Sequence, residues 1–326
     1  MPSPRATDTI IRLTLGTNNV YALPDPTGVT LIDAGPDYEG AWEELLDQLH
    51  PHDIAPADVH TVMLTHAHLD HAGLAARWQA AGARILIGRA DASALAMDDT
   101  ARQSERDRAR RELLRHGVPS AALSHRPTRG QRYTRWPAPL RITPVTPDGL
   151  LDDGPAAGHQ SRSLTVITCP GHTPGTTLFL DSDTGTLFTG DHILPRMAPT
   201  SGIQFDGARR RPSLPAYLAS LHTTRPLTDR VTAVLPGHGE PIDDLAEAVD
   251  WTVRLLEQRA RRMLRQLRRG PATAHALALR LFPHLNPQHL RPVMAECIGL
   301  LDLLVEHGRA TAVESPDVVV WNAVSH

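Results

Sequence analysis

Four side chains of the kind that bind metal ions stand within six residues, in the segment His66-Ala67-His68-Leu69-Asp70-His71. Imidazole nitrogens suit zinc, iron and other transition metals, and a carboxylate adds an oxygen donor and negative charge. Structural zinc sites usually contain cysteine, and no cysteine is near this segment. The segment therefore favours an open metal site of the catalytic kind over a closed structural one. A histidine-rich surface loop is the plain alternative.

Three later segments repeat one pattern, in which a strand-like run ends in a turn that carries a ligand-type side chain. His172 follows LTVIT, Asp191 follows TLFTG and His238 follows VTAVL. Glycines beside these residues permit tight turns and a close approach of the backbone. Any one of the segments alone is a weak signal. Together with the first segment, and in this order, they predict that one metal centre gathers side chains from several strand ends.

This succession of motifs resembles the metallo-β-lactamase-fold hydrolase superfamily, over about residues 10–242. The resemblance implies an α/β fold, a four-layer αββα sandwich, with a dinuclear metal site at one edge of its two sheets. It implies two divalent metal ions, Zn²⁺ first, with iron and manganese as alternatives. By matched motif, the first ion would be bound by His66, His68 and His172, and the second by Asp70, His71 and His238, with Asp191 bridging both.

The ligand set implies a hydrolase other than the common zinc β-lactamases, which have cysteine where this chain has Asp191. Two divalent ions lower the pKa of a shared water from about 15.7 to about 7 and polarise the bond to be cleaved. The resemblance therefore implies attack by a metal-bridging hydroxide. Asp70 is the expected catalytic residue, since its second oxygen can orient this hydroxide and receive its proton. Asp33 is expected to support the site structurally.

Strands and helices alternate in an order that predicts layered α/β structure. A Pro-rich loop over 194–215 is expected either to cover the active-site mouth or to be an exposed connection. A Pro- and Gly-rich stretch is expected over 117–163. The expected strands are 10–15, 29–34, 61–64, 83–87, 164–169, 176–182, 186–191, 231–235, 309–315 and 317–323, and the expected helices are 41–49, 72–81, 101–116, 214–221, 251–270, 272–281 and 288–306.

The C-terminal third changes character. Residues 251–326 hold ten Arg against six acidic residues, and most of this excess lies between Arg254 and Arg269. The order of helices and a closing hairpin resembles the winged-helix appendage of the β-lactamase-like-protein-2 branch, whose animal members are single-strand endoribonucleases. We expect a catalytic domain over 1–242, a basic linker helix over 243–270 and a winged-helix-like appendage over 271–326. A basic helix face is most often only a solvated surface.

Composition excludes several classes of activity. The 326 residues contain no Lys, which rules out a P-loop lysine and a Schiff-base lysine. Two cysteines cannot build a disulfide framework, and no apolar run is long enough to span a bilayer. A cytoplasmic protein with no membrane partner is expected. The family resemblance leaves a homodimer open.

Metal-dependent hydrolysis of a small activated ester, thioester or lactone is the leading functional hypothesis, with a small-molecule acyl substrate as partner. The first alternative is a single-strand endoribonuclease, which would use the basic helix on phosphates; the low aromatic content weighs against it. A mononuclear-iron persulfide dioxygenase and a winged-helix regulator are further alternatives. The lack of Lys and the segment DHILPRMAP after the bridging position disfavour a glutathione thioesterase of the glyoxalase II type.

Four other predictions concern single residues. His192 is expected to line the pocket, to support it from beneath or to face solvent. Cys169 is expected to be a small buried residue and not a nucleophile. Trp251 and Trp321 are expected to pack the C-terminal appendage. Its core is expected to include Leu300, Leu301, Leu303 and Leu304, with a dimer seam as the alternative.

Overall fold

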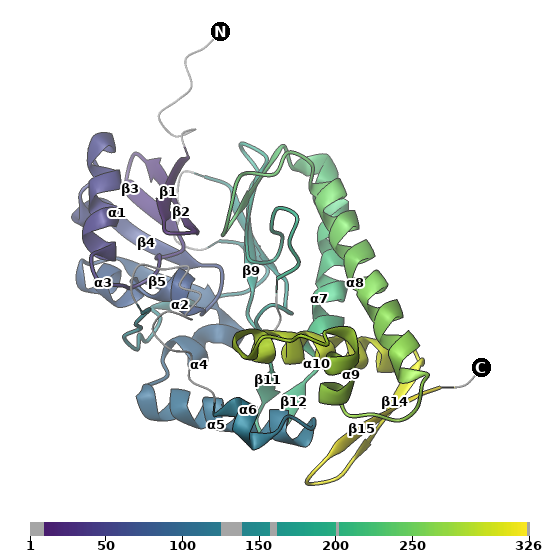
Figure 1. Ribbon diagram of the computed structural model, residues 1–326. Helices are drawn as coiled ribbons and strands as arrows, with labels where there is room; N and C mark the ends of the chain where they lie inside the picture. Colours follow the sequence, from purple (N-terminus) through teal and green to yellow (C-terminus); the bar gives the residue numbers. More distant parts are fainter. Residues whose placement is uncertain (1–9, 125–138, 157–161, 200–201, 325–326) are drawn as a thin grey trace. The chain divides into compact units, whose positions relative to one another are not determined.

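Figure 1 shows the computed structural model of the chain, which describes residues 10–124, 139–156, 162–199 and 202–324. Backbone contacts divide the chain into two compact units, which are described separately. Unit 1 comprises Met1–Asp98, Thr134–Pro199 and Leu221–Asp250, and unit 2 comprises Asp99–Tyr133, Thr200–Ser220 and Trp251–His326. In the parts of the chain described here, no helix is long and apolar enough to cross a membrane.

The first sheet of unit 1 has six strands in the order β1-β2-β3-β4-β5-β6. The first three pair antiparallel, and β3 to β6 pair parallel. Parallel neighbours need crossover connections, and helices supply them. The strands are β1 (Ile11–Leu15), β2 (Asn18–Asp25), β3 (Gly28–Ile32), β4 (Val59–Leu64), β5 (Arg84–Gly88) and β6 (Gly149–Leu151), and the helices are α1 (Ala41–Leu49), α2 (Leu69–Ala72), α3 (Ala75–Ala80) and α4 (Ala92–Leu95).

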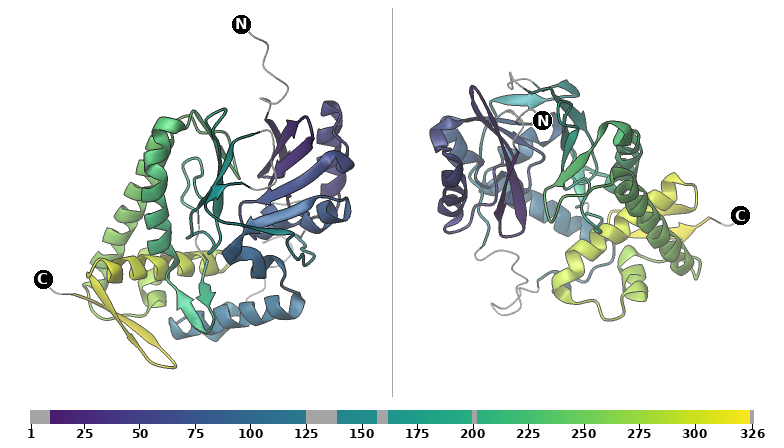
Figure 2. Two further views of the ribbon diagram at one scale, coloured as in Figure 1. Left: turned by 180° about the vertical axis from the view of Figure 1, so that it is seen from behind. Right: turned by 90° about the horizontal axis from the view of Figure 1, so that it is seen from above.

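Helices α1 and α3 cover one face of this sheet (Figure 2). Leu45 of α1 and Trp78 of α3 are fully buried against strand residues such as Leu13 and Ile85. In α1 the apolar residues recur three to four positions apart, which places them on one helical face. Full burial of a Leu or Trp side chain stabilises the fold by about 1.5–3 kcal/mol each.

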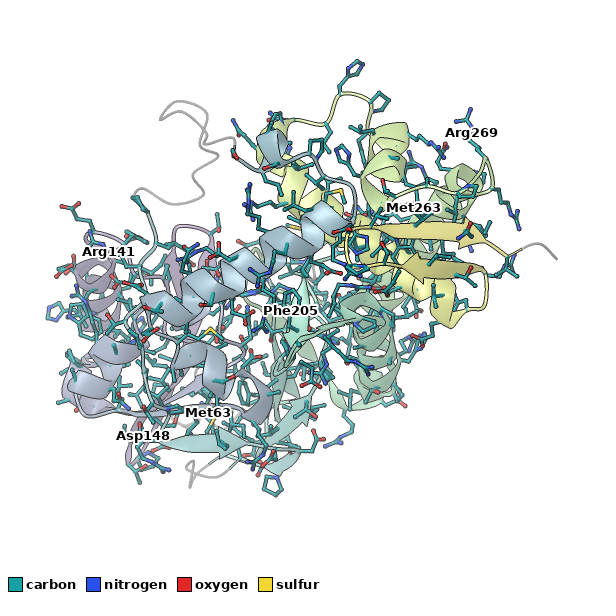
Figure 3. All side chains as sticks on the ribbon, turned by 90° about the horizontal axis from the view of Figure 1, so that it is seen from below. Met63, Arg141, Asp148, Phe205, Met263 and Arg269 are labelled. Atoms are coloured by element: carbon teal, nitrogen blue, oxygen red, sulfur yellow. The ribbon has the colours of Figure 1, made fainter. Side chains whose placement is uncertain are left out.

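The second sheet of unit 1 has five strands in the order β13-β10-β9-β8-β7. A shared core lies between the two sheets, in which the rings of Tyr21 and Phe188 meet edge to face with centroids 5.4 Å apart. Met63, labelled in Figure 3, belongs to the same core. The two sheets therefore pack face to face. The strands are β7 (Gly154–Pro155), β8 (Leu164–Thr168), β9 (Thr177–Asp181), β10 (Thr186–Gly190) and β13 (Ala233–Pro236).

Unit 2 gathers helices around a second apolar core. Met263, Leu277, Met294 and Trp321 are buried in it. Arg210 forms a bidentate ion pair with Asp302, in which Nη1 donates to Oδ2 at 2.5 Å and Nη2 donates to Oδ1 at 2.6 Å. Its elements are α5 (Asp99–Arg115), α6 (Ser120–Leu123), β11 (Gln204–Asp206), β12 (Arg209–Arg211), α9 (Ala274–Leu281), α10 (Leu290–Glu306), β14 (Ala310–Glu314) and β15 (Val319–Ala323), while α7 (Ser213–Thr224) and α8 (Leu245–Leu267) each have residues in both units.

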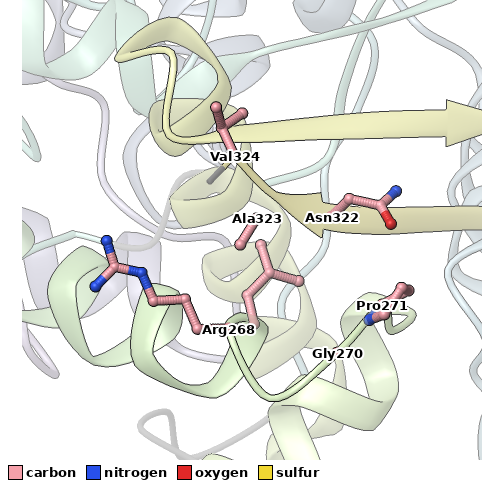
Figure 4. A pocket seen from close by; sticks show the side chains of 7 residues that line it. Arg268, Gly270, Pro271, Asn322, Ala323 and Val324 are labelled. Atoms are coloured by element: carbon pink, nitrogen blue, oxygen red, sulfur yellow. The ribbon is translucent and has the colours of Figure 1, made fainter. Parts of the chain in front are cut away.

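Unit 2 also contains a cavity of about 600 Å³ beside the end of α8. Figure 4 shows Asn322 and Ala323 on strand β15, facing the turn that carries Gly270 and Pro271. Arg268 is the charged residue in its lining, which contains no histidine or carboxylate among the described residues. This cavity therefore has no metal-binding chemistry.

The structure confirms the mixed α/β architecture and corrects several element boundaries. The helix expected over 72–81 is two short helices, which are separated at Leu74, where ψ is 3° in place of a helical value; Gly73 beside it is helical and packs closely on the backbone of Asp37. Strand β2, which begins with Asn18 and Asn19, is not among the expected strands. The expected loop 194–215 contains the antiparallel pair β11 and β12. Residues 200–201 of that loop, and 125–138 and 157–161 of the stretch 117–163, lie outside the described residues.

Candidate metal centre

The seven predicted ligands all lie in unit 1, just beyond the ends of strands from both sheets. His66 and His68 follow β4 of the six-stranded sheet, while His172 follows β8 of the five-stranded sheet. Asp191 and His238 follow β10 and β13, two parallel neighbours. Parallel strands end at the same edge, so their following residues meet there. Asp70 and His71 lie in α2, directly after the first pair of histidines.

Three imidazole rings form the first cluster. Nδ1 of His68 lies 3.0 Å from Nε2 of His66 and 2.9 Å from Nε2 of His172. The ring planes are nearly perpendicular to one another. Three ring nitrogens at such distances repel through their lone pairs unless a proton or a cation lies among them. This cluster can therefore bind a metal ion.

The second cluster combines one carboxylate with two imidazoles. Oδ2 of Asp70 lies 3.4 Å from Nε2 of His238 and 3.9 Å from Nε2 of His71. The side chains of His71 and His238 are 0% and 8% exposed, whereas that of Asp70 is 22% exposed. Asp70 is thus the member of this cluster that solvent reaches most easily.

Asp191 lies between the two clusters. Its Oδ2 is 3.4 Å from Nε2 of His172, while its Oδ1 is 3.3 Å from Nε2 of His71 and 3.4 Å from Nε2 of His238. The buried Oδ1 accepts no hydrogen bond among the described residues. A buried carboxylate oxygen in that state requires a positive partner. The donor set therefore fits two cations that share one carboxylate.

The pKa values of the histidines differ between the clusters. Burial and the neighbouring rings lower the pKa of His66 well below its usual value, and burial first, then His68, lowers that of His172 to about 3. Both rings are therefore neutral and able to coordinate a metal. Burial also opposes the charged form of His71, but Asp191, Asp33 and Asp70 outweigh it and raise the pKa of His71 well above the usual value. The three carboxylates thus make the surroundings of the His71 ring negative.

Comparison with known proteins agrees with this site. Residues 13–265 match the family model described as the metallo-beta-lactamase superfamily. The chain belongs to that superfamily. Its fold is that of a metallo-beta-lactamase family protein from Thermus thermophilus, with a TM-score of 0.78 at 25% identity over 97% of this chain and 98% of that one. A beta-lactamase domain protein from Burkholderia ambifaria has a TM-score of 0.72 at 22% identity, over 99% and 90% of the two chains.

Two curated relatives carry functional names. The probable metallo-hydrolase YqjP of Bacillus subtilis is 27% identical over 279 residues, which span 85% of this chain and 84% of that protein. Human acyl-coenzyme A thioesterase MBLAC2 is 28% identical over 180 residues, 53% of this chain and 54% of that protein. The match thus spans about half the human protein. Family membership and the donor clusters together support a metal-dependent hydrolase.

Within this metallo-beta-lactamase site, Asp33 holds one ring of each cluster. His71 donates from Nδ1 to Oδ2 of Asp33 at 2.7 Å, so the ring turns Nε2 toward the other donors. Thr65 donates from its hydroxyl to the same carboxylate and lies 3.0 Å from Nδ1 of His66. Such partners fix the tautomer and direction of a metal-ligating imidazole. Asp33 therefore contacts the ligands more directly than the sequence indicates.

Close backbone approach at the site requires glycine at two positions. A Cβ at Gly190 would lie 2.5 Å from Oγ1 of Thr65, and the residue has a φ of 48°. A Cβ at Gly237 would lie 2.6 Å from Cε1 of His71. The glycines that precede Asp191 and His238 therefore let these two turns approach the histidine loop.

The sequence did not predict several residues that hold the ligand loops in place. Asn19 donates from Nδ2 to the backbone oxygens of Pro236 and Gly239, and the Tyr21 hydroxyl donates to the backbone oxygen of Pro236 at 2.7 Å, so β2 holds the turn that carries His238. No sequence signal marked these residues. Asp91 was also missed, although it follows strand β5 in the same way that the expected ligands follow theirs.

His192 and Cys169 lie beneath the site. His192 is fully buried, which excludes the solvent-exposed alternative, and its Nε2 lies 2.8 Å from Oγ1 of Thr224. Burial lowers the pKa of His192 to about 3. The Cys169 thiol lies 3.7 Å from the same Thr224 hydroxyl, and burial raises its pKa to about 12. Cys169 is therefore buried and protonated, as predicted, and is no nucleophile.

Proposed function

We propose that the chain is a dinuclear metal-dependent hydrolase that cleaves a small activated acyl substrate, most simply a thioester. The observation that carries this proposal is the position of Asp191, whose two oxygens face different clusters. The imidazole-rich donor set favours Zn²⁺, with iron and manganese as alternatives. One ion would be held by His66, His68 and His172, the other by Asp70, His71 and His238, and both by Asp191.

Bound divalent ions would supply hydroxide at neutral pH and an electrophilic partner for the acyl oxygen. The chain's own residues position these reactants. Asp70 has the more exposed carboxylate, 22% against 11% for Asp191, and is held at 3.4 Å from His238. Burial would raise the pKa of Asp70, but His71 and His238 outweigh burial and hold it below the usual range, so the carboxylate is ionised and able to accept a proton. We assign Asp70 this catalytic role beside its role as a ligand.

The names of relatives support an acyl thioester as substrate class. MBLAC2 proteins of human, chicken and cattle, each 28% identical, are named acyl-coenzyme A thioesterases. Hydrolysis at a thioester carbonyl needs only the donor set and a nearby general base. No feature of the described chain requires a larger substrate.

The structure of unit 2 weighs against the winged-helix regulator. The order α9, α10, β14, β15 and the isolated bridge between Ala272 and Trp321 support our proposal of a winged-helix-like appendage over 271–326. In such modules the second helix of the pair enters the DNA groove. Here Gly299 of α10 packs on Leu214, and Asp302 pairs with Arg210, so the second half of this helix is covered within unit 2.

The test is a substrate panel on full-length protein with and without bound metal. We expect turnover of short-chain acyl-coenzyme A thioesters, or of lactones, that disappears after chelation and returns with zinc. Asp148→Asn is the matched control, because Asp148, labelled in Figure 3, is an exposed carboxylate directly before β6, whereas the ligands follow the ends of their strands. Cleavage of single-stranded RNA without acyl turnover would contradict the proposal, as would one iron per chain with oxygen-dependent consumption of a persulfide.

A further inference from the structure

A buried carboxylate outside the ligand set joins two of the ligand loops. Asp91 ends the short helix η4 (Arg89–Asp91) after β5 and is 1% exposed. Its Oδ2 accepts hydrogen bonds from the backbone N–H of Ala67 at 3.0 Å and the hydroxyl of Thr173 at 2.7 Å. Its Oδ1 accepts one from the backbone N–H of Gly175 at 2.7 Å. Both carboxylate oxygens of Asp91 therefore accept hydrogen bonds from the ligand loops.

The residues that donate these hydrogen bonds to Asp91 stand next to the histidines of the first cluster. Ala67 stands between His66 and His68, and Thr173 directly follows His172. Each imidazole of the first cluster is therefore adjacent in the chain to a residue that is bonded to Asp91. The histidine pair follows β4 and His172 follows β8, so these loops belong to different sheets. Asp91 couples the two sheets at the point where their histidines meet.

Tight packing leaves the loops little freedom around this carboxylate. A Cβ at Gly175 would lie 2.5 Å from the backbone nitrogen of Asp91. A Cβ at Gly88, at the end of β5, would lie 2.2 Å from the carbonyl oxygen of Gly175. The backbone of the His172 loop thus rests directly on the segment that carries Asp91. A shift of this carboxylate must move the loop.

We propose that Asp91 is the positioning residue of the first metal ion, which sets the spacing between the His66–His68 pair and His172. The inference rests on the proposed function, because it takes this cluster to bind an ion. Metal affinity is sensitive to displacements of about 0.5 Å in the donor atoms. Asp91 accepts hydrogen bonds from the backbone of both loops of the first cluster, whereas Asp33 accepts from the ring of His71 and from the backbone N–H and hydroxyl of Thr65.

Asp91→Asn preserves the size of the side chain and removes one acceptor. Two backbone N–H groups, of Ala67 and Gly175, face opposite oxygens of the carboxylate. Whichever way the new amide turns, its NH₂ group faces one of them. One of these two backbone hydrogen bonds is therefore lost. We expect the zinc affinity of one site to fall about 10–100-fold, the range for residues that orient metal ligands.

The test is equilibrium zinc binding by metal-stripped full-length protein in competition with a chromophoric chelator. In Asp91→Asn, one of the two binding steps should weaken and the other should not change. Asp70→Asn disrupts the second cluster. The ion that this variant still binds tightly therefore measures the affinity of the first cluster. Adding Asp91→Asn to this background should weaken that ion by a similar factor. Asp148→Asn is the control, since Asp148 also accepts a backbone N–H, that of Ile85 in β5.

A pair of variants at Thr173 tests the same contact if Asp91→Asn does not fold. Thr173→Val keeps the shape and removes the hydroxyl donor, and should weaken the first site several-fold. Thr173→Ser restores the donor and should restore the affinity. Unchanged binding in Asp91→Asn, or in Thr173→Val where the former is unfolded, would overturn this inference and leave the proposed function intact. Equal weakening of both steps would also overturn it. Wild-type protein that binds no zinc would overturn both.

Discussion

Nδ1 of His71 lies 2.7 Å from Oδ2 of Asp33, and both side chains are almost fully buried. The same carboxylate accepts the Thr65 hydroxyl, which meets the ring of His66. Asp33 therefore orients one imidazole of each donor cluster. Its backbone has a φ of 65°, a left-handed conformation that Asp and Asn adopt more readily than other side chains.

Asp33→Asn should therefore weaken metal binding without disturbing the backbone. One of the groups that donate to Asp33, on Thr65 or His71, would then face an amide NH₂ group in place of a carboxylate oxygen. We expect zinc affinity to fall about 10–100-fold. Chelator competition measures this loss, and circular dichroism checks that the fold is kept. Wild-type affinity in a folded variant would show that the contact between Asp33 and His71 does not orient the ligand.

Asp70→Asn should reduce turnover much more than stability. The amide cannot accept the proton of the attacking water, and general-base contributions are about 10²–10⁴-fold. We expect kcat to fall at least about 100-fold at saturating zinc. Thermal unfolding of the metal-free protein should change little, because the side chain is 22% exposed. Full activity of the variant, measured with the best thioester of the panel, would remove Asp70 from the catalytic role.

Chelation should lower the melting temperature of the protein. Ions that bind only the folded chain stabilise it by about 2.7 kcal/mol per site at 100 times the dissociation constant. The readout is thermal unfolding before chelation, after chelation and after zinc is restored. Identical melting curves in the three states would mean that the clusters bind no ion.

Acid should lower the free energy of unfolding of the protein by protonating Glu112. Burial raises the pKa of this carboxyl, but His116 and then Arg115 outweigh it and lower the value to about 2. The folded pKa lies below the unfolded one, so the stabilisation is present above about pH 4.5 and is lost as the pH falls toward 2.

Glu112→Gln isolates this contribution. We expect it to cost about 1.5–3 kcal/mol at pH 7, the range for hydrogen bonds to charged groups. The difference from wild type should shrink as the pH is lowered from 6 to 3, measured by denaturant unfolding with saturating zinc in both proteins. A difference that does not vary with pH would show that the Glu112 charge does not stabilise the fold.

Much of the fold and the site was predictable because strand ends leave a local signature. The segments around His66, His172, Asp191 and His238 each combine a hydrophobic strand, glycine and a donor. That signature is short-range. The roles of Asn19 and Asp91 depend on contacts with residues more than eighty positions away, between Asn19 and Gly239 and between Asp91 and Gly175. Asp91 stands after a strand as the ligands do, but its local sequence does not identify these partners.

The element boundaries that were wrong share a physical cause. The helix that the local pattern favours as continuous is interrupted at Leu74, next to the close backbone contact of Gly73 with Asp37. In the expected loop 194–215, Arg210 lies on β12 and is held by Asp302 at a separation of 92 residues. The turn residues of this segment predict a loop. The structure instead has the strand pair β11 and β12, with an ion pair from β12 to a residue distant in the sequence.

The central claim is that Asp191 is shared by two metal ions, and the stoichiometry of metal binding tests it most directly. Metal-stripped full-length protein should be titrated with zinc and the bound metal quantified per chain. We expect two zinc ions per wild-type chain, and weaker binding of both in Asp191→Asn, because each oxygen faces one cluster. A single ion per chain, or an Asp191→Asn variant that binds both ions like wild type, would contradict it.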